Sequence, residues 1–125
     1  MIEKLRLPES EEDIMLVVWG ERSPVTAPAI LEKLERPLTA SALHSYLKRL
    51  EEKGYLSCQK QGKVNAYTPL ISREEYQAQT SRTLLERLYE GSLSRFAAAL
   101  TGGKKLSRED IAELEAFLEE QKGGK

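Results

Sequence analysis

The sequence contains only one cysteine and one histidine among its 125 residues. Cys58 cannot form a disulfide within the chain, and His44 alone cannot supply a metal site or a catalytic triad. No apolar run reaches the roughly 18 residues that a membrane span needs, and no signal-peptide core follows Met1. We therefore expect a cytoplasmic protein that is not an enzyme, binds no metal or cofactor and does not enter a membrane.

Neither sign of charge dominates: 19 Lys and Arg face 20 Asp and Glu, giving a formal net charge of -1. This balance excludes a uniformly basic, histone-like protein. The charges are nevertheless unevenly placed. Residues 39–68 carry five basic and two acidic side chains, a local charge of +3, whereas residues 106–122 carry two basic and six acidic ones, a charge of -4. A locally positive segment is what binding to a phosphate backbone requires.

Three segments before residue 54 each begin at a serine or threonine cap and end at a glycine or before a proline. This pattern predicts helices over about 10–20, 26–34 and 39–53. In the first, Ser10 and Asp13 have the spacing of a capping box. After the third, Gly54 is placed for a left-handed helix stop. Two helices in quick succession, 26–34 and 39–53, have the pattern of a helix-turn-helix.

The pattern then changes to two short strands, 55–60 and 63–68, joined by a turn at Gln61-Gly62. We expect Cys58 in the first strand to be a small buried hydrophobic residue. Three helices followed by a hairpin are the element order of a winged helix. The tip of this wing would present Lys60 and Lys63 to a phosphate backbone.

One face of the third predicted helix has the chemistry of a DNA-reading surface. If Leu43, Leu47 and Leu50 face the core, the opposite face carries small or hydrogen-bonding groups and no acid. Such groups can approach base edges in a major groove about 12 Å wide. The predicted DNA contacts on this helix are Thr39, Ala40, Ser41, His44, Ser45 and Lys48. His44 could instead be a passive surface residue, and Arg49 could pair with Glu52 or a neighbouring helix as readily as with phosphate.

The rest of the chain reads as helical, with helices over about 73–90 and 93–100 and a last one capped at Ser107. Its apolar residues are too many for one monomer to hide, so a shared dimer core is the simplest arrangement; the alternative is that they fold back onto the winged helix. The predicted dimerisation residues are Tyr76, Leu84, Leu85, Leu88, Phe96, Ile111, Leu114, Phe117 and Leu118. The predicted division is a winged helix at 1–70, a helical dimerisation region at 71–121 and a flexible tail at 122–125.

Several stretches match one family of bacterial regulators in the order in which the family carries them. They are residues 11–19, 47–56, the wing sequences 61–63 and 67–70, and then 74–76 and 106–111. Through them nearly the whole chain resembles the penicillinase-repressor (BlaI/MecI) family of winged-helix regulators, to which the copper-responsive CopY repressors belong. The resemblance implies a mainly α fold with a small β-hairpin: a winged helix-turn-helix that binds DNA, followed by a C-terminal helical dimerisation region.

Three features depart from that family. Its reading helix commonly carries Thr-Val-x-Thr where this chain has Ala42–Ser45, which implies a different operator sequence. Members that respond to β-lactams are cut by a membrane sensor-protease at an Asn-Phe bond, where this chain has Ala99-Leu100. Copper-sensing members carry a C-terminal cysteine cluster that is missing here. The resemblance therefore implies the fold and DNA binding but no inducing signal, and it leaves any sensor or protease partner open.

These observations predict a homodimeric transcriptional repressor that binds a pseudo-palindromic double-stranded DNA operator. Each protomer would place its reading helix in a major groove and hold phosphate through its basic wing. The alternative is a winged helix that serves as a protein-interaction module and does not bind DNA specifically.

Overall fold

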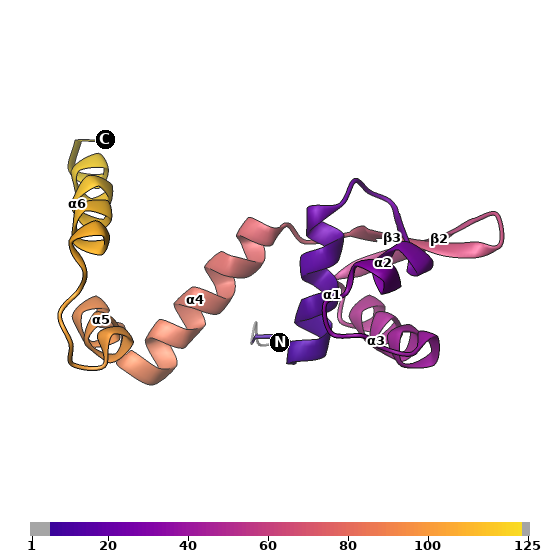
Figure 1. The fold of residues 1–125 in the computed structure, drawn as a ribbon, viewed down its shortest axis with the longest axis horizontal. Helices are drawn as coiled ribbons and strands as arrows, with labels where there is room; N and C mark the ends of the chain where they lie inside the picture. Colours follow the sequence, from indigo (N-terminus) through magenta and orange to yellow (C-terminus); the bar gives the residue numbers. More distant parts are fainter. Residues whose placement is uncertain (1–5, 124–125) are drawn as a thin grey trace. The chain divides into compact units, whose positions relative to one another are not determined.

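The computed structural model describes residues 6–123 (Figure 1). Within them the chain forms six helices and three short strands. It divides into two compact units, one ending at Thr83 and the other beginning at Leu84. The mainly helical fold with a small hairpin agrees with the fold class expected from the sequence.

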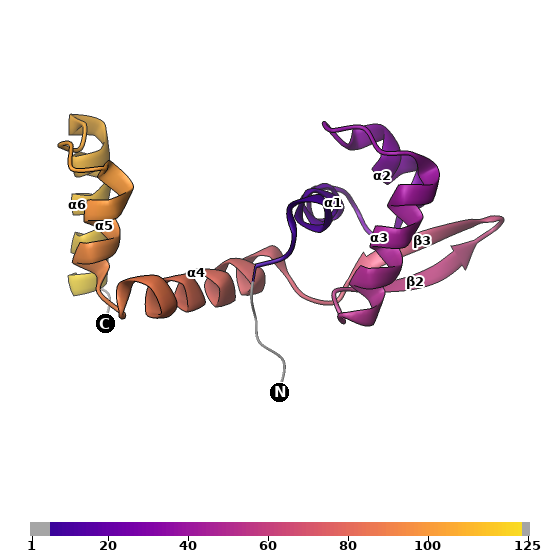
Figure 2. The same ribbon diagram turned by 90° about the horizontal axis from the view of Figure 1, so that it is seen from below.

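The first unit is a winged helix-turn-helix. Its elements are α1 (Glu9–Gly20), β1 (Val25–Thr26), α2 (Ala27–Lys33), α3 (Ala40–Glu52), β2 (Leu56–Gln61), β3 (Val64–Pro69) and the beginning of α4 (Arg73–Tyr89). The strands form an antiparallel sheet in the order β1-β3-β2. The β2–β3 hairpin extends beyond the helices in both views (Figures 1 and 2). The strand β1, only two residues long, was not expected from the sequence.

The caps expected at the starts of α2 and α3 are confirmed. The amide of Ala29 donates to Thr26 Oγ1 at 3.3 Å, and the amide of Ala42 donates to Thr39 Oγ1 at 3.0 Å. Each hydroxyl satisfies a backbone donor that has no partner within its own helix. Gly54 follows α3 at a φ of +86°, the left-handed conformation that ends the helix.

The capping box expected at Ser10 is wrong. The helix α1 begins at Glu9, its N-cap is Pro8, and no side chain caps it. Ser10 therefore lies inside the first turn, where its hydroxyl is not at the cap position. The acidic side chains that follow it bind groups elsewhere in the fold instead of the helix's own amides.

The core of the first unit lies where the three N-terminal helices meet the sheet. Met15 and Val18 of α1 are fully buried in it. Trp19 packs against the core and donates from its indole Nε1 to the carbonyl of Ile71 at 2.9 Å. This bond ties α1 to the segment that leads into α4.

Tyr76 shows why the first unit continues past the boundary expected after residue 70. It lies in the first turns of α4 and is only 5 % exposed. Its ring lies 5.4 Å from that of Trp19 and 6.0 Å from that of Tyr55. The beginning of α4 therefore completes the core of the winged helix, and the compact units divide after Thr83.

The second unit contains the end of α4, then α5 (Leu93–Thr101) and α6 (Arg108–Gly123). Ser92 and Ser107 cap these two helices by accepting from Arg95 and Asp110 amides. The helix α6 continues through Lys122 to Gly123, so the flexible tail expected from residue 122 does not begin there; residues 124–125 lie outside the described part. Among residues 84–123 none is buried.

Candidate nucleic-acid interface

The helices α2 and α3 form a helix-turn-helix in which α3 buries one face and exposes the other. Leu43, Leu47 and Leu50 are at most 2 % exposed and hold α3 in the core. The opposite side is open to solvent. All six positions expected to contact DNA on this helix are exposed: Thr39, Ala40, Ser41, His44, Ser45 and Lys48.

The polar groups on this face are available to a ligand. The side chains of Ser41, His44, Ser45 and Lys48 make no hydrogen bond or ion pair with any residue between 6 and 123. Thr39 differs, because its Oγ1 already accepts the Ala42 amide and holds the start of the helix. The face is therefore a set of free donors and acceptors with an ammonium group at its C-terminal end.

The wing carries two more free ammonium groups. Gln61 pairs with Val64 across the hairpin, so the turn consists of Gly62 and Lys63, one residue later than expected. Gly62 has a φ of +65°, a conformation that suits glycine at the first position of a two-residue hairpin turn. Lys60 and Lys63 are exposed and make no ion pair among the described residues.

The positive charge of this region is smaller than the sequence count suggests. Lys53 places its Nζ 2.6 Å from Oε1 of Glu11, a side chain that is 1 % exposed. This lysine therefore neutralises a buried carboxylate and is not free to bind phosphate. The cations that remain on α3 and the wing are Lys48, Arg49, Lys60 and Lys63.

Arg49 pairs neither with Glu52 nor with a residue of a neighbouring helix among the described residues, and its contact with phosphate stays a prediction. Its guanidinium lies 5.6 Å from the centre of the Tyr46 ring, three residues earlier on α3. A cation over an aromatic face is attracted by the ring's negative potential. The i, i+3 spacing of an aromatic and a basic residue on one helix was the signal that could have predicted this contact.

Cys58 is exposed, so the buried position expected for it is wrong. It lies on β2 directly opposite Tyr67 of β3, and both pKa values are raised. Loss of water around the sulfur on folding raises the pKa of the Cys58 thiol above its ordinary range. Burial of the phenol raises the pKa of Tyr67 to about 12. Both groups stay protonated and uncharged at neutral pH.

The predicted dimerisation residues fall into three groups. Tyr76 is a correction: it is buried in the first unit and is not free to meet a second chain. Leu85 and Phe96 are half-buried, and Phe96 packs its ring edge-on against Tyr89 at 5.4 Å. The remaining members are exposed: Leu84, Leu88, Ile111, Leu114, Phe117 and Leu118. Leu93 and Leu100, which the prediction did not include, are further exposed apolar residues of the same helical region, each 71 % exposed.

Residues 6–123 offer neither a metal site nor a membrane-spanning helix. No group of three or more His, Cys, Asp or Glu side chains could hold a metal ion there. No helix in this part of the chain is long and apolar enough to cross a membrane.

Comparison with known proteins gives consistent matches along almost the whole chain. The family described as Penicillinase repressor matches residues 7–120. A penicillinase repressor of Bacillus licheniformis is 32% identical over 122 residues, which are 96% of this chain and 94% of that protein. The methicillin resistance regulatory protein MecI of Mammaliicoccus sciuri is 22% identical over 114 residues, 90% of this chain and 92% of that protein. A penicillinase repressor of Staphylococcus aureus is 22% identical over 117 residues, 92% of each chain.

Proposed function

This chain belongs to the penicillinase-repressor family, a family of transcriptional repressors and not of enzymes, and on that premise we propose that it binds a pseudo-palindromic DNA operator as a homodimer. Each protomer inserts α3 into a major groove, and its wing contacts the flanking backbone. The protein acts in the cytoplasm, where its operator is. Its target sequence differs from that of relatives that carry the threonine-rich reading helix.

The observation that carries this proposal is the free polar face of α3. Ser41, His44 and Ser45 expose hydrogen-bonding groups that no part of the described chain uses. Lys48 lies on the same face one turn after His44. A surface made of small donors and acceptors without a carboxylate fits base edges and phosphates, and it offers little to an apolar protein partner.

The cations around this face supply affinity that does not depend on sequence. Lys48, Lys60 and Lys63 carry no counter-charge from the described residues, and Arg49 is held over Tyr46 without an acidic partner. Four cations per protomer would neutralise about eight phosphates in a dimer. The expected slope of log affinity against log salt is then roughly -5 to -7, depending on how many of the four make contact.

The exposed apolar side chains of the second unit support dimerisation. Leu114, Phe117 and Leu118 of α6 are each about half-exposed, and α6 has no buried residue of its own. Apolar groups gathered on one short helix are unfavourable in water unless another surface covers them. A second copy of the same region covers them symmetrically and also gives the two-fold relation that a palindromic operator needs.

The test is selection of duplexes from a random DNA pool by the purified protein, followed by titration of the selected duplexes at several salt concentrations. Enrichment of an inverted repeat, bound by two protomers with the slope given above, is the expected result. Weak binding to every duplex at low salt alone would contradict the proposal and would leave the protein-interaction role as the better account of the α3 face.

A further inference from the structure

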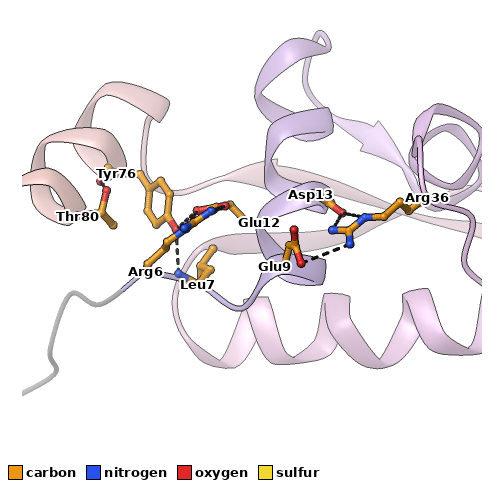
Figure 3. Close-up of polar contacts among 8 residues, drawn as sticks. All are labelled: Arg6, Leu7, Glu9, Glu12, Asp13, Arg36, Tyr76 and Thr80. Carbon is orange, nitrogen blue, oxygen red and sulfur yellow. Dashed lines mark hydrogen bonds and ion pairs between the residues drawn. The ribbon is translucent and has the colours of Figure 1, made fainter. Parts of the chain in front are cut away.

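Three consecutive acidic residues of α1 contact three different parts of the first unit. Glu11 binds Lys53 at the end of α3, and Asp13 binds Arg36 in the segment between α2 and α3. Glu12 binds Arg6 and Tyr76 (Figure 3). Successive helix residues point about 100° apart, so neighbours in sequence leave the helix in different directions. Glu12 and Asp13 do so in Figure 3.

The contact between Glu12 and Tyr76 is the centre of a partly buried network of hydrogen bonds. The Tyr76 hydroxyl donates to Glu12 Oε2 at 2.6 Å and accepts from the Leu7 amide at 2.8 Å. Arg6 donates to both oxygens of the same carboxylate at 2.8 to 3.2 Å. Burial raises the pKa of the Tyr76 phenol, so that it keeps the proton it donates. This network of hydrogen bonds joins the segment before α1, α1 itself and the start of α4.

The Tyr76 hydroxyl is not required to fill the space in which the Tyr76 ring packs. The Tyr76 ring already lies against Trp19 and Tyr55, so a phenylalanine would fill the same space. Ring packing, however, allows the helix to rotate or tilt by several degrees at little cost. A short hydrogen bond to a carboxylate is directional and fixes the orientation of the side chain that donates it.

The helix α4 continues without a break from this contact into the second unit. It has 17 residues and is therefore about 25 Å long. A tilt of about 10° at its first turn would move its far end by about 4 Å, which exceeds the 3.4 Å rise of one base step. The direction that α4 takes at Tyr76 therefore affects the distance between the two winged helices of the proposed dimer.

We propose that Tyr76 and Glu12 are positioning residues that fix the direction in which α4 leaves the winged helix and thereby specify the half-site spacing that the dimer accepts. The proposal rests on the dimeric DNA binding proposed above. Neither residue touches DNA. Their effect is on the preference for one spacing over its neighbours, and not on how well α3 binds a single half-site.

The experiment compares the wild type with Tyr76→Phe and Glu12→Gln in the full chain. Thr80→Val is the matched control, because Thr80 lies one turn further along α4 and its hydroxyl bonds only to carbonyls of the same helix. Each protein is titrated with the selected operator, with versions whose half-sites are one or two base pairs closer or further apart, and with an isolated half-site. Thermal unfolding of each variant is measured alongside.

Wild type and Thr80→Val should prefer one spacing sharply. Tyr76→Phe should lower that preference by about fivefold, the factor that the loss of one hydrogen bond supports, and leave half-site affinity within about twofold. Glu12→Gln, which keeps an acceptor for the Tyr76 hydroxyl, should have a smaller effect. An unchanged spacing profile in Tyr76→Phe, or an equal loss of affinity on every duplex including the half-site, would overturn the proposal. Failure of the wild type to bind any inverted repeat would instead overturn the proposed function on which it rests.

Discussion

Lys53, directly after the last residue of α3, lies with its Nζ 2.6 Å from Oε1 of Glu11, which is buried in α1. At the other end, Arg36 in the segment before α3 pairs with Asp13 of the same helix. The proposed reading helix is thus held to α1 at both ends by ion pairs. Lys53 of the basic region serves this purpose and is therefore not part of the proposed phosphate-binding surface.

Lys53→Met is expected to destabilise the winged helix by about 2 kcal/mol. The substitution leaves the Glu11 carboxylate without its charged hydrogen-bond partner, and such bonds are worth about 1.5–3 kcal/mol. Urea unfolding followed by circular dichroism measures the change. Lys48→Met is the control, since Lys48 is exposed and makes no ion pair among residues 6–123. Equal stability of the two variants would show that the pair contributes nothing.

Substitutions in the wing and in α3 should affect DNA binding differently. Lys63→Ala should weaken binding to all duplexes alike and reduce the size of the salt slope by about 1 per protomer. Ser45→Ala and His44→Ala should instead change which base pairs are preferred at particular positions. Binding of each variant to a panel of single-base operator variants at two salt concentrations separates the effects. The same uniform loss for all three variants would contradict the assignment of roles.

Phe117→Glu should convert the proposed dimer to a monomer. The phenylalanine is 54 % exposed on α6, and a carboxylate at its place would have to lose water inside the proposed dimer core. Analytical ultracentrifugation gives the association state. Leu16→Glu is a matched control because Leu16 is also an exposed apolar residue but lies on α1. If both variants remain dimers, α6 is not the dimer surface.

The contribution of Glu12 to stability should disappear in acid. Its hydrogen bonds with Arg6 lower the pKa of this carboxyl below its ordinary value, so the folded state favours the charged form. Stability from such a group is complete above the unfolded pKa of about 4.3 and is lost as the pH falls through the lower folded value. The difference in unfolding free energy between wild type and Glu12→Gln should therefore be constant from pH 7 to about pH 5 and shrink below that.

Glu74→Gln controls for the loss of one negative charge, since Glu74 is exposed and makes no hydrogen bond or ion pair among the described residues. A difference between wild type and Glu12→Gln that stays constant down to pH 3 would show that the charge of Glu12 does not stabilise the fold.

Cys58 should react slowly with iodoacetamide although it is exposed. Its raised pKa keeps the sulfur as a thiol at neutral pH, and the thiolate is the reactive form. Native protein at pH 7.5 should be alkylated more slowly than protein unfolded in urea, and its rate should still be rising with pH above the ordinary thiol pKa of about 8.5. Mass spectrometry follows the modification. A native rate equal to the unfolded one would contradict the raised pKa.

Local features of the fold could be predicted because their partners are near in sequence. Thr39 caps α3 through the amide of Ala42, three residues later. Ser72 and Glu75, three residues apart, form a capping box before α4 with bonds of 2.9 and 3.0 Å. Leu43, Leu47 and Leu50 are buried as their spacing indicates, and this fixes which face of α3 is exposed. The exposure of the proposed DNA contacts follows from that spacing.

Prediction from local spacing failed for side chains whose interaction partner lies far along the chain. The acidic run after Ser10 has the spacing of a helix cap, but Glu12 finds Tyr76, 64 residues away, and Asp13 finds Arg36. A spacing rule counts neighbours within one helical turn and cannot detect such competing partners. Tyr76 was misplaced for the same reason: its position among the apolar residues of the second half says nothing about the rings of Trp19 and Tyr55.

The helices, the hairpin and the polar face of α3 could thus be predicted from local sequence, because caps, turns and helical periodicity depend on residues at most four positions apart. Tertiary contacts set which charges stay free, which tyrosines are buried and where the first compact unit ends. Those properties depend on which side chains the folded chain brings together across tens of residues. For Lys53 and Tyr76 that contact turned an expected surface group into part of the framework that holds α3 and α4.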